Sequence, residues 1–380
     1  MANPKVGQIT SYDVVENVID FSDILNEKKM PSTPLLNKIG ILNEPVYSTT
    51  YQWYDEAFPI LSTEVKVDSS QPNTGNRVLK VVSTVGILVN SVIKVGDKIY
   101  RVTEVTNNET LEVEPVVGNT DTGTIAAKTS VTIVANSALE GADYEDGHYN
   151  PLIERFNVTQ IFKDYVKITG TQDAVRRKVR GAILAQEIDN KMKRLRVMLE
   201  RAAWLGVRTN PGNNNTPRLM GGIDWFITNN STGIIATSNL SVTTPNFEAD
   251  FKAFLGKIYD VRGSVNEAWM NPVTMEYFLA LGEDAFLIDQ YSEQAGRNVK
   301  MYVSQYGETA LNMSPDIPPN VIYIVDTSNI KIRPLVNRQF QFEELAKTGD
   351  SVKGQLIGEY TLEFRNPDLA GKLTITPATS

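Results

Sequence analysis

The densest group of side chains that could do chemistry is an acidic run, LEGADYEDGHYN, at residues 139–150. Glu140, Asp143, Glu145 and Asp146 could supply oxygen ligands to a calcium ion, or a pair of them could act as the acid and base of a hydrolase. Their spacing does not match an EF-hand loop, and neighbouring carboxylates are common in loops. We therefore expect no metal site here. A carboxylate-based hydrolase that uses Asp143 and Glu145 stays a remote alternative.

Composition removes most other chemistry. The 380 residues include no cysteine and a single histidine, His148, which excludes disulfides, thiolate nucleophiles and His/Cys metal sites. The phosphate-loop pattern GxxxxGK, the dinucleotide pattern GxGxxG and the nucleophile elbow GxSxG are all absent from the sequence. A net charge of −8 and a pI near 5.0 disfavour general nucleic-acid binding. No apolar run is long enough to span a membrane. Any catalysis would have to use carboxylates, Lys, Tyr, Ser/Thr or an oxygen-ligated metal.

The most unusual element is a predicted helix at Thr169–Leu205, whose charge is opposite to that of the whole chain. Nine Lys/Arg and four Asp/Glu give it a net charge of +5, and its length of about 37 residues corresponds to about 55 Å. Its apolar residues form two half-length stripes on roughly opposite sides, not the single seam of a coiled coil. We interpret it as a spine whose two ends pack on different partners. Its candidate inter-subunit residues are Arg176, Arg177, Arg180, Lys191 and Arg194.

A second predicted helix, near the N-terminus, carries the opposite charge. Its acids recur at intervals of three and four residues, so they share one face, while apolar residues occupy the other. These acids are Asp13, Glu16, Asp20, Asp23 and Glu27. An ordinary solvated surface explains this pattern, and so does an acidic ridge that docks on a basic element of a neighbouring subunit. The basic spine has a rival interpretation as a weak, non-specific DNA contact.

The remaining chain predicts an α+β protein. Residues 31–50 contain three prolines and little periodicity, so we expect an extended arm. Short β-branched runs separated by turn residues indicate a small all-β domain at about 76–136, inserted into a larger fold. Its expected strands are Arg77–Val82, Lys98–Val105, Thr110–Glu114 and Ser130–Val134.

Further elements are expected towards the C-terminus. Phe247–Tyr259 has the pattern of an amphipathic helix, Glu267–Met270 of a short strand, and Pro272 of the first turn of another helix. Near the end, apolar Tyr360, Leu362 and Phe364 alternate with polar residues. This alternation predicts a strand with one buried and one solvated face.

Several short motifs, in order along the chain, resemble those of the major capsid (major head) proteins of tailed bacteriophages, whose shells have the Hong Kong 97 fold. The motifs are EGADYE (140–145), NVTQIF (157–162), ITGTQDAV (168–175), ERAAWLG (200–206), PRLMGGI (217–223), TGD (348–350) and GEYTLEFRNPDLAGKL (358–373). Each motif alone is weak, whereas their order over most of the chain is more specific.

The resemblance implies a domain map and a function. The map has an N-terminal arm at 1–45, an extended loop at 46–165 with the all-β insertion, and an axial domain at 222–332. A peripheral domain with the spine helix takes residues 166–221 and 333–380. The implied function is self-assembly, as pentamers and hexamers, into an icosahedral phage head that encloses double-stranded DNA. The resemblance also implies a protein that is not an enzyme, with no catalytic residues and no required cofactor.

The resemblance also implies partners and a location. Portal and scaffolding proteins, and a possible decoration protein, would join the virion capsid, which would assemble in the host cytoplasm. A cellular encapsulin-like nanocompartment shell protein is the alternative with the same fold.

Overall fold

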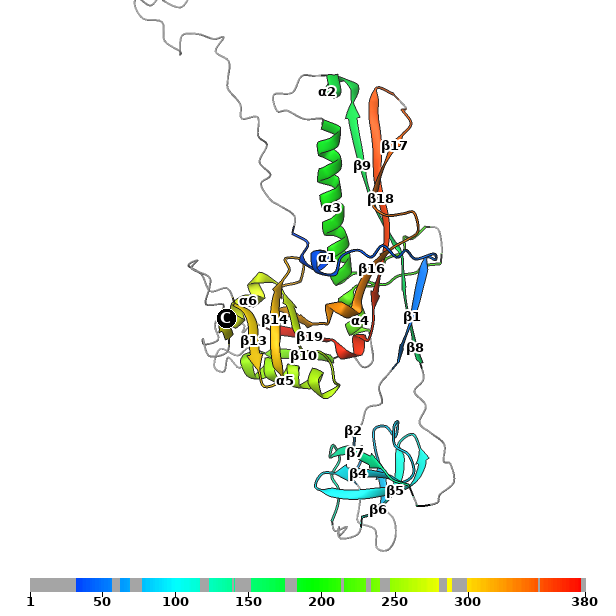
Figure 1. Cartoon of the computed structure of the whole chain (residues 1–380), viewed down its shortest axis with the longest axis vertical. Coiled ribbons are helices and arrows are strands. Elements are labelled where there is room, and N and C mark those ends of the chain that lie inside the picture. Colours follow the sequence, from blue (N-terminus) through cyan, green and yellow to red (C-terminus); the bar gives the residue numbers. More distant parts are fainter. Residues whose placement is uncertain are drawn as a thin grey trace, which may run out of the picture. The chain divides into compact units, whose positions relative to one another are not determined.

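A computed structural model describes residues 32–56, 62–68, 77–116, 123–138, 140, 152–174, 183–212, 215–229, 234–239, 247–279, 286–288, 299–347 and 349–376. The chain forms two compact units (Figure 1): one comprises Met1–Gln52 and Phe156–Ser380, and the other Trp53–Arg155. The unit boundary falls within two paired strands, β1 (Thr50–Glu56) and β8 (Leu152–Val158). Within the described part, no helix is both long and apolar enough to cross a membrane.

The unit Trp53–Arg155 contains a six-stranded antiparallel sheet with the order β2-β7-β4-β5-β6-β3. Its strands are β2 (Ser62–Glu64), β3 (Arg77–Lys80), β4 (Ser91–Val95), β5 (Lys98–Asn107), β6 (Thr110–Pro115) and β7 (Ser130–Asn136). A bridge between Val65 and Val81, with N–H···O bonds from Lys66 to Lys80 and from Val82 to Glu64, joins the two edges and closes the sheet into a barrel. Among the described strands of this unit, closure leaves the barrel sheet without a long unpaired edge.

The four strands expected in this region are present as β3, β5, β6 and β7, while β2 and β4 were not predicted. Three residues for β2 and five for β4 are too few to show a clear period. The side chains that point inward are almost all apolar and fully buried, as at Ile93, Tyr100 and Leu111. The barrel therefore has a hydrophobic core of its own.

In the larger unit, the first sheet is four-stranded. Its strands are β9 (Gln160–Thr169), β16 (Ile330–Pro334), β17 (Gln341–Leu345) and β18 (Ser351–Phe364). Strand β18 pairs antiparallel with all three others, so it is the centre of the sheet. Its Gly354 and Gly358 lie so close to the rings of Phe342 and Phe340 that a Cβ atom would collide with them.

The predicted spine helix is described as α2 (Gly170–Ala174) and α3 (Ile183–Leu205), with 175–182 outside the described residues. Helix α3 contacts β9 and β18 along one side (Figure 1). Its C-terminal turns bury Leu195, Leu199 and Trp204 completely, and Trp204 stacks on Tyr323 of the second sheet. The described spine thus packs on both sheets of this unit.

The second sheet has seven strands in the order β10-β19-β15-β11-β14-β13-β12. The strands are β10 (Ile234–Asn239), β11 (Glu267–Met270), β12 (Phe286–Ile288), β13 (Val299–Ser304), β14 (Gly307–Met313), β15 (Val321–Ile324) and β19 (Gly371–Thr376). The helices of this region are α4 (Ile223–Thr228), α5 (Phe247–Asp260) and α6 (Pro272–Leu279). Short 3-10 turns occur at Thr327–Asn329 and Pro367–Leu369.

The expected elements at 247–259, 267–270 and 272 onwards are present as α5, β11 and α6. The amphipathic face of α5 supplies Phe251, Phe254 and Ile258 to the core of this sheet. Strand β19, which the predicted map assigned to the peripheral elements, pairs here with β10 and β15.

Two expectations about local structure were wrong. Residues 31–50 are not extended throughout, because α1 (Pro34–Ile39) forms within them, with Pro34 in the first turn where its missing N–H costs nothing. The strand expected to have one solvated face is instead buried on both: Glu359 is 3% exposed, and Thr361 and Glu363 are 0% exposed. Neighbouring segments supply hydrogen-bond partners for these polar residues, which permits their burial.

Candidate functional site

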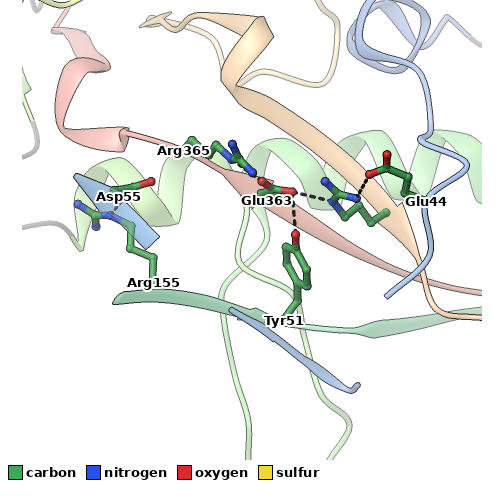
Figure 2. Close-up of polar contacts among 7 residues, drawn as sticks. Glu44, Tyr51, Asp55, Arg155, Glu363 and Arg365 are labelled. Atoms are coloured by element: carbon green, nitrogen blue, oxygen red, sulfur yellow. Dashed lines mark hydrogen bonds and ion pairs between the residues drawn. The ribbon is translucent and has the colours of Figure 1, made fainter. Parts of the chain in front are cut away.

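One buried carboxylate with several hydrogen-bond donors is Glu363 on β18 (Figure 2). It accepts a hydrogen bond from Arg333 Nε at 2.6 Å, from Arg365 Nε at 2.5 Å and from the Tyr51 hydroxyl at 3.3 Å. Arg333 also donates to Glu44, in the segment that follows α1, at 2.7 Å. One buried carboxylate therefore joins β18, β16 and β1, and through Arg333 the arm segment.

The electrostatics of this cluster keep its charges in place. Burial by itself would raise the pKa of Glu363, but the hydrogen bonds and positive charges of Arg333 and Arg365 outweigh burial and lower it. Burial, followed by the negative charge of Glu363, raises the pKa of Tyr51. A carboxylate that stays ionised, with both oxygens engaged, is suited to holding segments together and unsuited to proton transfer.

A second buried carboxylate, Glu359, lies on the same strand. It accepts a hydrogen bond from the Thr159 hydroxyl at 2.6 Å, and ion pairs reach it from Arg218 at 3.1 Å and Arg338 at 3.0 Å. Thr159 lies between β8 and β9, while Arg218 comes from the loop that precedes α4. Glu359 therefore connects the residue between β8 and β9 to the loop that precedes α4 and to Arg338.

The third buried carboxylate, Glu200, lies near the end of α3. It is 0% exposed and accepts the backbone N–H groups of Leu35 and Leu36, each at 3.0 Å. The next residue, Arg201, pairs with Asp316 beyond β14 at 2.7 Å. Adjacent residues of α3 thus hold α1 and the loop that follows β14.

These three carboxylates lie in motifs that are far apart in the sequence and meet in the fold. Glu200 belongs to ERAAWLG, and Glu359 and Glu363 belong to GEYTLEF. Asn157 of NVTQIF donates to the backbone oxygens of Leu362, at 2.7 Å, and Gly221 of PRLMGGI, at 3.0 Å. We call this set of contacts the junction: Glu200, Glu359, Glu363 and the residues hydrogen-bonded to them.

Glycines allow two of these motifs to approach each other. The N–H of Gly222 donates to the carbonyl of Gly206 at 2.8 Å. A Cβ atom on Gly222 would lie 2.7 Å from both Ala202 O and Gly206 N. Only residues without a side chain fit where the chain after α3 passes back over its last turn.

The candidate contact residues of the spine are only partly described. Lys191 and Arg194 both approach Asp164 of β9 in the same chain, at 3.3 and 3.5 Å. Arg194 keeps 58% of its side chain exposed. The remaining candidates lie outside the described residues: Arg176, Arg177, Arg180, Asp13, Glu16, Asp20, Asp23 and Glu27. The acidic run at 139–150 is also outside them, apart from Glu140, which is exposed.

Sequence reasoning missed the junction. Glu200 had been counted as one of the acids that offset the basic spine, and the polar residues of β18 had been taken as solvated. The sequence did contain a weak signal. Arg333 lies in a short apolar strand, and Arg365 lies two residues after Glu363, and both positions suggest that a buried arginine pairs with a carboxylate. Among the described residues, no group of three or more potential metal ligands lies close enough to hold an ion.

Comparison with protein families identifies the kind of protein to which the junction belongs. A family model described as SU10 major capsid protein matches residues 8–377. The chain belongs to the SU10 major capsid protein family. Its members are structural proteins, so the predicted structural, non-enzymatic role in an icosahedral capsid is confirmed. This capsid protein assembles with copies of itself, and its place is the virion capsid.

Solved structures agree with the family. The structure of Microbacterium phage Oxtober96 matches with a TM-score of 0.51 and 12% identity over 98% of this chain and 100% of that chain. The structure of Mycobacterium phage Bobi matches with a TM-score of 0.50 and 10% identity over 98% of this chain and 100% of that chain. The capsid of an empty GTA particle matches with a TM-score of 0.51 and 11% identity over 97% of this chain and 98% of that chain. No curated protein sequence matches the chain.

At such low identities these matches establish the fold alone. The α+β capsid fold predicted from the sequence is confirmed, and the matches are consistent with its Hong Kong 97 type. In this capsid protein, the junction is the place where α1 and the segment after it, β1, the residues between β8 and β9, α3 and the loop after β14 are held together.

Proposed function

We propose that this capsid protein forms pentamers and hexamers that close into an icosahedral head around double-stranded DNA. The observation that carries the proposal is the family match over residues 8–377, which leaves almost no part of the chain outside a capsid subunit. A closed shell requires the same chain to repeat about rotation axes. The similar GTA capsid was computed with C5 symmetry, which supports a five-fold capsomer.

We further propose the domain roles that the resemblance implies. Residues 1–45 act as the arm, 46–165 as the extended loop, and 222–332 as the axial domain. The spine and 333–380 form the peripheral domain. The compact unit Trp53–Arg155 lies within the proposed extended loop, which supports that assignment. The pairing of β19 with β10 and β15 argues for adding the last strand to the axial domain.

The proposed inter-subunit contact joins the acidic face of the arm to the basic spine of a neighbouring copy. Opposite charge supports it, because the segment Thr169–Leu205 has a net charge of +5 in a chain of −8. The pairing of Lys191 and Arg194 with Asp164 reduces the positive charge available at that end of the spine. We therefore expect Arg176, Arg177 and Arg180 to contribute more to the contact than Lys191 and Arg194.

The proposed partners follow from head assembly. A portal protein and a scaffolding protein would act with the shell in the host cytoplasm, and a decoration protein could join it. DNA would contact the shell weakly and without sequence preference, since an acidic chain repels phosphates.

Electron microscopy of the expressed chain tests the assembly proposal. We expect closed shells with five-fold and six-fold capsomers, and nuclease-resistant DNA in particles from a complete infection. A persistent small oligomer would contradict shell formation. Particles filled with a protein cargo and free of DNA would point to a nanocompartment instead.

The arm–spine contact has its own test. The triple variant Asp13→Asn, Glu16→Gln, Asp20→Asn removes three negative charges, so its shells should form in lower yield than those of the wild type. The difference should be greatest at low salt and should shrink as salt screens the wild-type contact. A matched control removes three exposed acids of the barrel, Glu64→Gln, Asp97→Asn and Glu104→Gln. Equal shell yield and salt sensitivity in the two triple variants would rule out the arm–spine contact.

A further inference from the structure

Glu200 is unusual because its carboxylate is buried in the spine and binds backbone rather than a cation. Its Oε1 accepts from Leu35 N and its Oε2 from Leu36 N, each at 3.0 Å, and the Ser314 hydroxyl lies 3.4 Å from Oε1. Within the described part of the chain no lysine or arginine pairs with it, because neighbouring Arg201 is directed to Asp316 at 2.7 Å. The arm therefore satisfies a charge that the spine buries.

The carboxylate of Glu200 also satisfies backbone N–H groups at the start of α1. The first backbone N–H groups of a helix have no partner within the helix. Thr33, which precedes α1, makes no side-chain cap, and its hydroxyl is directed at Asn37 instead. An uncompensated buried N–H or carboxylate costs free energy, so each side of this contact stabilises the other.

The other attachments of the arm lie further along the chain. Leu42 N and Val46 N donate to carbonyls of β16 at 2.9 and 2.8 Å, and Glu44 pairs with Arg333. Lys38 pairs with Glu267 of β11 at 3.0 Å, with 38% of its side chain exposed. Among the described contacts, the Glu200 bonds are the buried charged ones nearest to the start of the arm.

We propose that Glu200 is the positioning residue of the N-terminal arm. It fixes Leu35 and Leu36 on the spine, and so it sets the point at which the preceding acidic segment joins the subunit and from which that segment could reach a neighbour. The second half of this statement rests on the proposed arm–spine contact, whereas the first half concerns a single chain.

The full chain carrying Glu200→Gln tests the first half. The amide nitrogen of glutamine cannot accept a hydrogen bond, so one of the two arm N–H groups loses its acceptor. We expect hydrogen exchange at Leu35 and Leu36 to accelerate by roughly tenfold or more, because exchange reports local opening. Exchange at Leu42 and Val46 should change little. Glu200→Asp keeps the charge but is one methylene shorter, so its effect should be intermediate.

Glu359→Gln is the matched control, since it alters another buried carboxylate of the junction that does not contact the arm. It should leave exchange at Leu35 and Leu36 unchanged. Unaltered exchange in Glu200→Gln, or the same acceleration in Glu359→Gln, would overturn the assignment of Glu200. If Glu200→Gln does not fold, the same comparison is made with Glu200→Asp.

Shell formation tests the second half. Glu200→Gln should lower the yield of shells and raise the rate of proteolytic cleavage before Thr33 in the shells that form. Faster exchange with normal shell yield and normal cleavage would show that Glu200 fixes the arm without directing it. If the wild-type chain forms no shells, the proposed function fails, while the exchange result still decides whether Glu200 holds the arm.

Discussion

The barrel of the Trp53–Arg155 unit and the sheet around β18 are both built from antiparallel strands, yet they bury different chemistry. The barrel core consists mainly of apolar side chains, and its ion pairs Lys66–Glu109 and Arg101–Glu114 are partly or largely exposed. The buried Arg77 of β3 donates to the backbone carbonyl of Gly123 at 2.8 Å. The β18 region buries Glu359 and Glu363 together with Arg333. One region is stabilised mainly by hydrophobic burial, and the other also depends on paired charges.

The two regions also differ in the range of their contacts. In the barrel, Arg101 and Glu114 pair across neighbouring strands 13 residues apart. In the junction, Glu200 binds Leu35 across 165 residues, and Tyr51 reaches Glu363 across 312. The contacts of the barrel, even the pairing of Ser62 with Thr132, stay within its own unit, whereas the polar contacts of the junction join distant segments of the larger unit.

The largest expected effect comes from breaking the junction. Glu363→Ala leaves Arg333 buried without its carboxylate and Arg365 without its pair, so we expect a loss of about 3–5 kcal/mol in the free energy of unfolding. Urea denaturation at neutral pH measures it. Glu104→Gln, on the exposed face of the barrel, should change stability by less than about 0.5 kcal/mol. A loss below about 1 kcal/mol for Glu363→Ala would remove the distinction between the two regions.

The same distinction explains what could be predicted from the sequence. The strands β5 and β6 and the helix α5 follow from periodicity and turn residues, because their partners are near in the chain or are simply apolar. The burial of Glu359, Glu363 and Glu200 could not be predicted, since each depends on donors contributed by distant segments. Motif order identified the capsid family, but it did not show that those motifs meet around β18.

A smaller effect is expected from acidification, because two carboxylates of the junction should change stability with pH in opposite directions. The bonds from Arg333 and Arg365 outweigh burial and lower the pKa of Glu363 below its ordinary 4.5. The stability it contributes is therefore present above about pH 4.5 and is lost as the pH falls through the lowered value. Burial raises the pKa of Glu200 above the same ordinary value, despite the N–H groups of Leu36 and Leu35. Its contribution is complete below about pH 4.5 and is lost as the pH rises through the raised value.

Urea unfolding at several pH values can separate these two signs. The free energy of unfolding of the wild type, relative to that of Glu363→Gln, should decrease as the solution is acidified below about pH 4.5. The free energy of unfolding of the wild type, relative to that of Glu200→Gln, should increase as the pH falls towards about 4.5. Parallel pH profiles for the two comparisons would mean that the two carboxylates do not differ in this way.

The smallest expected effect lies on the barrel surface. The Lys66–Glu109 pair has an N···O distance of 2.7 Å, close to the 2.6 Å of Arg333–Glu363, but its side chains are 47% and 54% exposed rather than 9% and 0%. Water screens the exposed charges, so a double-mutant cycle with Lys66→Met and Glu109→Gln should give a coupling of about 0.2–1 kcal/mol. The corresponding cycle for Arg333→Met and Glu363→Gln should give about 2–3 kcal/mol. Since the two distances are nearly equal, equal couplings would show that burial contributes nothing to the difference between the regions.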